Sequence, residues 1–329
     1  MSKQKAMISI SVIVPLYNEA DGISNFINGL ISVLSKITPE FEIICIDDGS
    51  TDKTRAELKS ARKLDARIKL LAFSRNFGKE AALTAGLDLA SKDVVIPIDA
   101  DFQDPPQLIP AMIAKWQEGF DVVLAHRRTR NDSVMKNLFS SLYHKLLFWI
   151  SNRTIPADVG DFRLMDKKVV EAIRQMPEKT RYMKGIFAWV GFRKAVIEYD
   201  RPNRKSGVSK LKYYHLFKLG LDGIFSFSTK PLKIWLYIGA VFSLFAFFYA
   251  ILLVLRTMVF GVSVPGYASI MVSILFIGGI QLVSLGIIGE YIARIYKETK
   301  NRPIYIVSEQ HGFKEEKVSS STKRQSRYA

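Results

Sequence analysis

Residues 94–106 read VVIPIDADFQDPP, which is a short apolar run, two aspartates separated by one alanine, and a turn at Pro105-Pro106. A run of roughly four to eight apolar residues that stops at polar ones is typical of a buried parallel strand. Asp99 and Asp101 would then lie at the carboxyl end of a strand, which is where ligands bind in open α/β sheets. This segment therefore predicts both the fold class and the place of the site.

Similar runs recur through the N-terminal half of the chain, with helical stretches between them. The predicted strands are Ile8–Pro15, Glu42–Asp47, Ile68–Ser74, Val94–Asp99 and Val122–Ala125, and the helices include Gly22–Ser35 and Gly78–Ala90. Alternating strands and helices of these lengths predict an α/β fold with a doubly wound, mostly parallel sheet. Polar clusters follow several of the strands, so we expect the sheet edge to carry the chemistry.

The chain is strongly basic. Its 329 residues include 47 Lys and Arg against 31 Asp and Glu, which gives a formal charge of +16. Such a charge implies an anionic partner: nucleic acid, anionic lipid or a phosphorylated substrate. The basic residues are spread along the chain without helix-turn-helix or zinc-finger spacing, so we expect no nucleic-acid partner. The absence of a glycine-rich phosphate loop leaves a kinase, ATPase or nicotinamide enzyme without motif support.

The composition changes abruptly near Pro231. No charged residue occurs over 234–255, and a second uncharged stretch covers 261–289. Because a membrane-spanning helix needs roughly 20 apolar residues, we predict a two-helix transmembrane hairpin with spans at about 234–255 and 264–289. Two buried helices of a soluble core are the alternative, but long helices in soluble proteins normally carry a polar stripe.

Basic residues decide the expected orientation of this hairpin. Lys230 and Lys233 precede it, several Lys and Arg follow it, and the loop between the spans offers only Arg256. Positive charge favours the cytoplasmic side, so both termini are expected in the cytoplasm, and the absence of a secretory signal agrees with this. The single cysteine, Cys45, excludes an internal disulfide and suits a reducing compartment.

The expected domain organisation follows from these segments. We predict a cytoplasmic domain over 1–210, an interfacial juxtamembrane helix over 211–230, the hairpin over 231–293, and a basic cytoplasmic tail over 294–329 that is partly disordered. Residues 135–150 and 211–227 mix aromatic and aliphatic side chains with lysines, as interfacial helices do. Core helices are the alternative for both.

The strand ends offer ligands for a metal and a nucleotide. Asp99 and Asp101 supply two hard oxygen ligands of the kind that Mg²⁺ or Mn²⁺ needs when it also bridges a diphosphate, although a solvated turn is the alternative. Asp47 could accept a hydrogen bond from the ring N–H of uracil or guanine. Tyr17 and Glu19 could hold the base and ribose.

A second use for part of this region is helix capping. Ser50 or Thr51, which follow Asp47, could cap the next helix, and a plain turn is the alternative for residues 15–19.

Five motifs together resemble a known family. PLYNE (15–19), DDGSTD (47–52), DADFQDPP (99–106), GDFRLM (160–165) and RPNRKSGVSKLK (201–212), followed by two spans, resemble the polyprenyl-phosphate glycosyltransferases of glycosyltransferase family 2. That group contains dolichyl-phosphate mannose synthases and bacterial undecaprenyl-phosphate glucosyltransferases, and the two-span hairpin is similar to the latter branch, which serves cell-envelope glycosylation. The resemblance covers about residues 8–300 and implies a fold of the GT-A type.

The resemblance implies roles for particular residues. Nucleotide-binding positions are Pro15, Tyr17, Glu19 and Asp47; metal and diphosphate positions are Asp99 and Asp101, with Gln103 beside them. Arg127 and Arg130 match a pair near the lipid phosphate, and Arg201, Arg204, Ser209 and Lys210 match a mobile loop that closes over the phosphates. Asp161 matches the acceptor-side carboxylate proposed as catalytic base, with Asp158 as the neighbouring alternative.

The expected activity combines these inferences. Transfer of one hexose, with glucose from UDP-glucose as our choice, to polyprenyl phosphate would occur with inversion at the cytoplasmic face of a bacterial inner membrane. Asp101 and Asp161 are the expected catalytic residues, and Mg²⁺ or Mn²⁺ is the expected cofactor. No Gln-x-x-Arg-Trp occurs, which argues against a processive synthase. A GDP-mannose donor, another nucleotide sugar, and a non-catalytic sugar-nucleotide-binding scaffold are the alternatives. Small residues in the second span favour a homo-oligomer.

Overall fold

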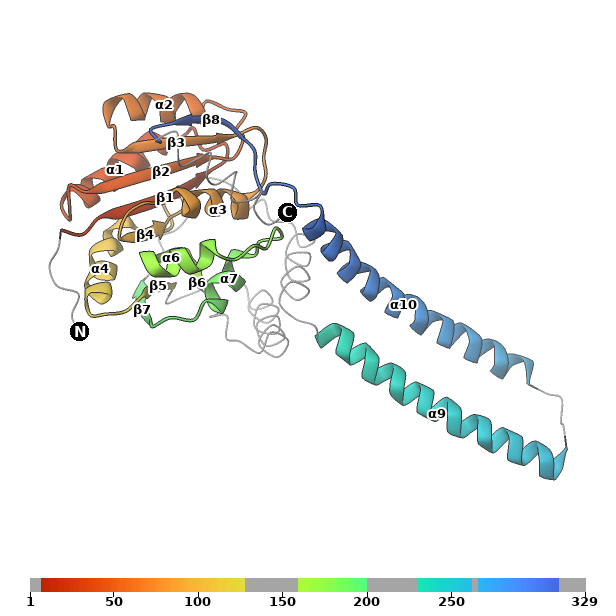
Figure 1. Cartoon of the computed structure of the whole chain (residues 1–329). Coiled ribbons are helices and arrows are strands. Elements are labelled where there is room, and N and C mark those ends of the chain that lie inside the picture. Colours follow the sequence, from red (N-terminus) through yellow and green to blue (C-terminus); the bar gives the residue numbers. More distant parts are fainter. Residues whose placement is uncertain (1–6, 128–158, 200–229, 262–265, 314–329) are drawn as a thin grey trace.

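The computed structural model describes residues 7–127, 159–199, 230–261 and 266–313. An α/β domain occupies one end of the molecule, and two long antiparallel helices, α9 and α10, project from it (Figure 1). The predicted interfacial helices at 135–150 and 211–227, and the tail beyond residue 313, lie outside the described residues.

The domain is built on an eight-stranded sheet with the order β7-β5-β6-β4-β1-β2-β3-β8. Its strands are β1 (Ile10–Leu16), β2 (Phe41–Asp47), β3 (Ile68–Phe73), β4 (Val94–Pro97), β5 (Val122–Arg127), β6 (Val159–Asp166), β7 (Lys194–Tyr199) and β8 (Val307–His311). The helices are α1 (Ile23–Ser35), α2 (Thr54–Leu64), α3 (Lys79–Leu89), the 3-10 turn η1 (Pro106–Leu108), α4 (Ile109–Gln117), α6 (Lys167–Arg174), α7 (Met183–Trp189), α9 (Lys230–Phe260) and α10 (Tyr267–Thr299).

The α/β class is confirmed, and the sheet is mixed. The central strands β4, β1, β2 and β3 run parallel, and β5 and β7 pair in parallel as well. By contrast, β6 is antiparallel to both β4 and β5, and β8 is antiparallel to β3. All five predicted strands are present within about two residues at each end. The strands β6, β7 and β8 were not predicted, because their polar or alternating sequences do not form the continuous apolar runs of a doubly buried strand.

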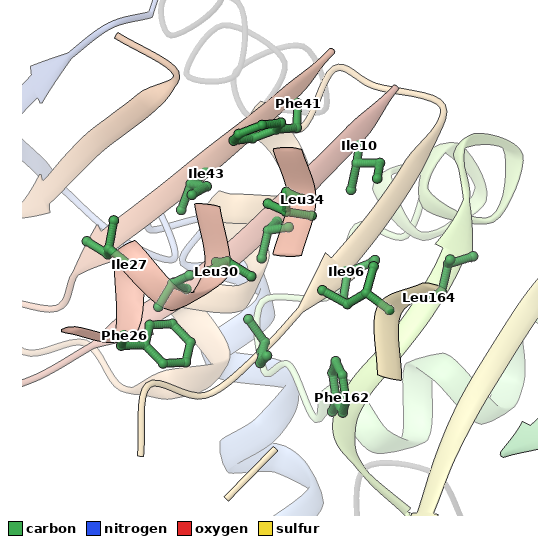
Figure 2. Packing of buried hydrophobic residues seen from close by; sticks show 14 of the residues in the cluster. Ile10, Phe26, Ile27, Leu30, Leu34, Phe41, Ile43, Ile96, Phe162 and Leu164 are labelled. Carbon is green, nitrogen blue, oxygen red and sulfur yellow. The ribbon is translucent and has the colours of Figure 1, made fainter. Parts of the chain in front are cut away.

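Two apolar layers cover the two faces of the sheet. On one face, Ile10, Val12 and Val14 of β1 pack with α1, and Figure 2 shows part of this layer around Phe26 and Leu30. On the other face, Ile13 packs against α3. That contact requires a glycine, since a Cβ on Gly86 of α3 would lie 2.2 Å from Ile13 Cγ2. Because alternate residues of a buried strand face opposite layers, β1 is apolar at every position except Ser11.

The helices α9 and α10 correspond in position to the two predicted spans. Many of their large apolar side chains are exposed, including Phe245, Leu252 and Met258, and the two helices touch through an edge-to-face contact of Phe242 with Phe276 at 5.8 Å. Among the described residues, one helical segment, Phe276–Thr299, is long and apolar enough to cross a membrane. The two-span topology therefore stays a prediction.

After α10 the chain returns to the α/β domain. Glu298 accepts hydrogen bonds from the backbone N–H groups of Lys179 and Thr180, both at 2.9 Å. Tyr305 stacks on Phe73 at 4.9 Å, and β8 then adds to the sheet edge alongside β3 (Figure 1). Residues 300–313, which the sequence suggested would belong to a tail, thus complete the sheet.

Candidate active site

The parallel strands bring the predicted site segments to one edge. The register pairs Leu16 of β1 with Asp47 of β2, and Ile13 of β1 with Pro97 of β4. Parallel strands end at the same side of a sheet, so the loops after β1, β2 and β4 are neighbours. The sequence-based expectation that these loops share one edge of the sheet is confirmed.

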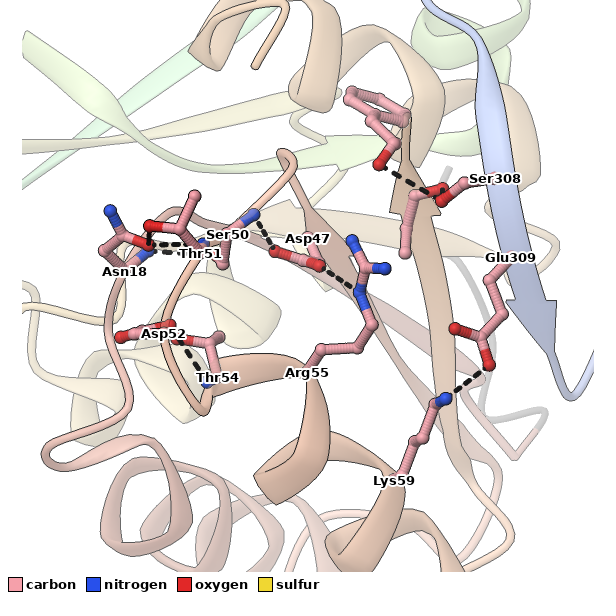
Figure 3. A network of polar contacts seen from close by, with 12 residues as sticks. Asn18, Asp47, Ser50, Thr51, Asp52, Thr54, Arg55, Lys59, Ser308 and Glu309 are labelled. Atoms are coloured by element: carbon pink, nitrogen blue, oxygen red, sulfur yellow. Dashed lines mark hydrogen bonds and ion pairs between the residues drawn. The ribbon is translucent and has the colours of Figure 1, made fainter. Parts of the chain in front are cut away.

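Side chains join the loops after β1 and β2 (Figure 3). The backbone N–H of Asn18 donates to Ser50 Oγ at 3.0 Å, and the backbone N–H of Thr51 donates to Asn18 Oδ1 at 2.9 Å. Asn18 has a left-handed backbone, with φ 55°, which asparagine tolerates better than most residues. The expectation that Ser50 or Thr51 caps α2 is wrong: both are used between the loops, and the Asp52 carboxylate accepts the backbone N–H of Thr54.

Asp47, at the end of β2, is fully buried and already has two donors. Its carboxylate accepts the backbone N–H of Ser50 at 2.9 Å and Arg55 Nε at 2.8 Å. Each carboxylate oxygen can accept more than one hydrogen bond, so a nucleobase N–H would share Asp47 with these groups.

Asp48 and Gly49, which follow Asp47, contact the loop between β3 and α3. The Asp48 carboxylate accepts the backbone N–H groups of Phe77 and Gly78, at 2.7 and 2.9 Å. Burial raises the pKa of Asp48 above its ordinary value, although these two hydrogen bonds oppose the rise. A Cβ on Gly49, whose φ is +70°, would lie 2.4 Å from the carbonyl carbon of Arg75, so only glycine fits this turn.

The loop after β4 carries Asp99 and Asp101 and contains a strained residue. Phe102 has φ 57°, which is uncommon for a residue with a bulky side chain. Its ring lies edge-on to Phe26 of α1 at 5.6 Å, and Asp101 Oδ1 accepts the backbone N–H of Gln103 at 3.1 Å. Strain of this kind occurs at functional sites where the surroundings over-determine the backbone.

A lysine that the sequence reading missed lies between the predicted carboxylates. Lys79, the first residue of α3, places Nζ 2.7 Å from Asp99 Oδ2 and 2.7 Å from Asp161 Oδ2. Burial disfavours its charge, but the two carboxylates outweigh burial and raise the pKa of Lys79. Its position at the start of the helix that follows β3 was the available signal, since the other polar clusters also follow strands.

Asp161 reaches the site from β6. That strand pairs antiparallel with β4, Val94 opposite Asp166 and Val95 opposite Met165, and the same register extended further places residue 161 opposite residue 99. Burial raises the pKa of Asp161, but the charge of Lys79 outweighs burial and the net pKa is lowered.

Arg163 directs its hydrogen bonds to the backbone of its own strand. It donates to the backbone carbonyls of Gly160 and Asp161, at 2.7 and 3.4 Å, and lies over the Phe187 ring at 4.0 Å. Burial lowers the pKa of Arg163 to about 10. The Asp161 carboxylate is bound by Lys79 instead.

Glu80, the next residue of α3, lies beside this cluster and is mostly buried. Its carboxylate accepts the backbone N–H of Met183, the first residue of α7, at 2.8 Å. Burial raises the pKa of Glu80 to about 7, and the nearby negative charge of Asp161 adds to the rise. Sequence reasoning did not single out this residue.

The remaining predicted site residues divide into two groups. Pro15, Tyr17 and Glu19 lie at the same edge, and the Tyr17 side chain is 45% exposed. Arg127 is the last residue of β5, where only its backbone is described. Outside the described residues lie Arg130, Asp158, Arg201, Arg204, Ser209 and Lys210.

A divalent metal fits this edge only with help from a ligand. Within the described residues, no group of three or more His, Cys, Asp or Glu could hold a metal ion. Asp99 and Asp101 supply two carboxylates. Mg²⁺ is commonly bound by one or two carboxylates together with substrate phosphates and water, and this donor set suits that arrangement.

Comparison with known proteins identifies the family of this chain. Residues 11–174 match the model of glycosyl transferase family 2, and residues 230–295 match the GtrB C-terminal hairpin. An uncharacterized glycosyltransferase of Synechocystis sp. is 49% identical over 306 residues, 93% of this chain and 96% of the relative. The chain is therefore a glycosyltransferase that belongs to family 2.

Further relatives have more specific names. The SfII prophage-derived bactoprenol glucosyl transferase of Shigella flexneri is 47% identical over 306 residues, 92% of this chain and 99% of that protein. A solved structure of glucosyl-3-phosphoglycerate synthase from Mycobacterium tuberculosis, in complex with Mn²⁺, UDP and phosphoglyceric acid, is more distant: it is 18% identical, with a TM-score of 0.47, over 66% of this chain and 76% of that one.

Proposed function

We propose that this glycosyltransferase transfers a single glucose from UDP-glucose to a polyprenyl phosphate, with inversion and with a divalent metal. The observation that carries the proposal is the convergence of Asp99, from the loop after β4, and Asp161, from β6, on one ammonium group at the edge of the sheet. The name of the relative from Shigella flexneri, a bactoprenol glucosyl transferase, supports the sugar and the lipid.

The donor would lie across the loops after β1, β2 and β4. Tyr17, Glu19 and Asp47 would bind the nucleoside, and Asp99, Asp101 and Gln103 would face the diphosphate. When bound, Mg²⁺ or Mn²⁺ would stabilise the negative charge that develops on the departing diphosphate. Asp101 would hold this end of the donor in place.

The acceptor would approach from the side of Asp161. A polyprenyl phosphate is already an anion near neutral pH, so Asp161 need not act as a strong base and can orient the sugar or hold a proton. Direct attack by a phosphate oxygen on the anomeric carbon forms one C–O bond as the bond to the diphosphate breaks, which inverts the anomeric centre.

Two phosphate-bearing substrates in one site require cations. Basic side chains near the site would neutralise them by charge-assisted hydrogen bonds. These are Arg127, Arg130, Arg201, Arg204 and Lys210, with Ser209 as a further donor.

The membrane arrangement is also part of the proposal. Residues 1–210 would form the cytoplasmic catalytic domain, 211–230 an interfacial helix, and 231–293 a two-span hairpin with both termini in the cytoplasm of a bacterium. The exposed apolar side chains of α9 and α10 support contact with lipid, because soluble proteins rarely expose so much contiguous apolar surface. We expect the protein to form homo-oligomers.

The test is a donor panel. Membranes containing the protein are incubated with labelled UDP-glucose, GDP-mannose and other sugar nucleotides together with undecaprenyl phosphate, and the glycolipid is extracted. We expect label from UDP-glucose in the lipid fraction. Label from another donor would replace the sugar in the proposal, and binding of a nucleotide sugar without turnover would indicate a scaffold instead.

A further inference from the structure

We propose that Lys79 is a positioning residue: it holds the donor-side carboxylate of Asp99 and the acceptor-side carboxylate of Asp161 together, and it competes with the metal ion for Asp99. The proposal rests on the proposed function, because it assumes that the two carboxylates serve opposite substrates. No sequence motif indicated Lys79, and its role follows from its contacts alone.

The contacts are short and symmetrical. Lys79 Nζ lies 2.7 Å from one carboxylate oxygen of each aspartate, Asp99 Oδ2 and Asp161 Oδ2. These distances are typical of charge-assisted hydrogen bonds. One ammonium group therefore connects the loop after β4 with β6, which belong to the two halves of the site.

The backbone around Lys79 is fixed on both sides. The N–H of Gly78, just before it, donates to the carboxylate of Asp48, and the side chain of Glu80, just after it, accepts the N–H of Met183 in α7. Lys79 is also the first residue of α3, which packs through Gly86 on β1. The backbone of Lys79 is therefore held in place, and a ligand can shift the ammonium group only by changing the side-chain torsions.

A purely structural role does not explain this placement. The side chains of Lys79 and Asp99 are 43% and 30% exposed, and an ion pair at such positions contributes little to stability, because water already solvates the charges. The carboxylates of Asp99 and Asp161, by contrast, require a nearby cation. Asp161 is mostly buried beside Glu80, and without a nearby cation these negative charges and Asp99 would repel one another. Lys79 therefore sets the geometry of the site more than the stability of the fold.

The shared ammonium has a consequence for metal binding. Asp99 Oδ2 cannot give its full charge to a metal ion while it binds Lys79. A donor that arrives with its metal would take over Asp99 and leave Lys79 with Asp161 as its partner, close to the acceptor. Removal of the ammonium group should thus strengthen binding of a metal alone, yet weaken turnover.

The experiment uses the full-length protein in detergent or nanodiscs. Lys79→Met and Lys79→Arg are compared with the control Lys115→Met, which removes the same charge from an ion pair of equal exposure, 42%, on α4. Binding of Mn²⁺ alone is measured by electron paramagnetic resonance, binding of UDP by calorimetry, and kcat and KM with the donor that the parental protein uses. Melting temperatures identify any variant that is misfolded.

We expect Lys79→Met to bind Mn²⁺ alone several-fold tighter than the parental protein and Lys115→Met. Its kcat should fall roughly 100-fold, the loss that a small misplacement of a reacting group can cause. Lys79→Arg should recover at least roughly tenfold of this loss, because the charge is retained. The double variant Lys79→Met/Asp161→Asn should be no slower than the slower single variant, since the two residues act as a unit.

Several results would overturn the proposal. Unchanged or weaker Mn²⁺ binding by folded Lys79→Met would show that Lys79 does not compete for Asp99. Losses in kcat that multiply in the double variant would separate Lys79 from Asp161. A loss of UDP affinity equal to the loss of kcat/KM would make Lys79 a donor ligand instead. If the parental protein transfers no sugar, the proposed function fails, but the Mn²⁺ measurement still decides whether Lys79 and the metal compete.

Discussion

The acidic residues at the edge of the sheet differ in what they do for the protein, and substitutions can separate these roles. Asp47 and Asp48 accept hydrogen bonds that hold the loops, whereas Asp99 and Asp161 share the charge of Lys79. A loop carboxylate should therefore affect folding as well as binding. Substitution of Asp99 or Asp161 should reduce sugar transfer more than stability.

Asp101→Asn tests the metal and diphosphate role that we propose for the loop after β4. We expect a loss of sugar transfer of roughly 100-fold or more with an unchanged melting temperature, because the amide keeps the shape but not the charge that a metal requires. The control is Asp93→Asn at the opposite end of the same strand, where the carboxylate binds Ser9. That variant should lose some stability and keep its turnover per folded molecule. Parental rates in Asp101→Asn with metal present would contradict the assignment.

Gly49→Ala tests the turn between the loops. The new Cβ would have to lie 2.4 Å from the Arg75 carbonyl carbon, and the residue would keep a positive φ. Both effects are unfavourable, so we expect a destabilisation of roughly 2 kcal/mol or more, together with weaker nucleotide binding. Gly29→Ala is the control, because nothing lies within 4 Å of a Cβ there. Equal melting temperatures for the two variants would contradict this reading.

The raised pKa of Glu80 predicts that the stability of the protein depends on pH. The folded protein holds this carboxyl with a pKa of about 7, against an ordinary value of 4.5, so between these pH values the folded state binds more protons than the unfolded state. Stability should therefore fall by on the order of 3 kcal/mol as pH rises from about 4.5 to 7, and stay level above that range. Lys79 and Lys184 limit the fall by favouring the charged form.

Glu80→Gln should remove most of this fall. The amide oxygen can still accept the Met183 N–H, so the contact with α7 is retained while the charge is lost. Melting temperatures of the two proteins at pH 5 and pH 8 provide the measurement. If both lose the same number of degrees between these pH values, another group is responsible.

At the scale of elements, the main feature is that β8 closes one edge of the sheet after the long helices. Two kinds of contact hold it: Tyr305 stacks on Phe73, and Glu309 pairs with Lys59 of α2 at 2.5 Å (Figure 3 shows the second). The same face of α2 carries Arg55, which binds Asp47. The segment that follows the hairpin is thus connected to the loop that we assign to the nucleotide.

The two contacts should differ in strength. Tyr305→Ala removes apolar area and ring stacking and should destabilise the domain by roughly 2–3 kcal/mol. Glu309→Gln breaks a partly exposed ion pair, which is typically worth less than about 1 kcal/mol. Chemical denaturation of both variants measures the difference. A larger effect of Glu309→Gln would show that electrostatics, and not packing, holds β8.

At the scale of the whole molecule, the domain is attached to the helices at both of its ends. The chain enters α9 after β7 and returns from α10 through Glu298 and β8 (Figure 1). The hydrogen bonds of Glu298 and the pairing of β8 with β3 restrict how the domain can turn relative to α10. This arrangement suits an enzyme whose acceptor is fixed in a membrane.

The native cysteine makes the proposed topology easy to test. Cys45 is fully buried, and burial raises the pKa of its thiol to about 12, so it should not react with maleimides in the folded protein. In intact cells, an impermeant maleimide should label Ser263→Cys, between the two helices, but not Ser2→Cys. In permeabilised cells, the maleimide should label both cysteine variants. Labelling of Ser2→Cys from outside intact cells would reverse the orientation.

The amino-acid sequence by itself determined the α/β class, the five buried strands and the edge that carries the aspartates. These features are local: an apolar run long enough for a buried strand, followed by polar residues, appears within a few positions of the chain. The strained turn at Phe102 was not predicted, and the predicted capping of α2 by Ser50 or Thr51 was wrong, because these residues contact distant segments: Phe102 contacts α1, and Ser50 and Thr51 bind Asn18.

Only the tertiary structure decided how the halves of the site meet. Lys79 belongs to the site because β6 lies antiparallel beside β4 and brings Asp161 next to Asp99. No local sequence pattern predicts that pairing. The polar strand β8 likewise forms because β3 offers it an unpaired edge. Burial and hydrogen-bond partners across distant segments exist only after the chain has closed on itself, and they set the charges of this site.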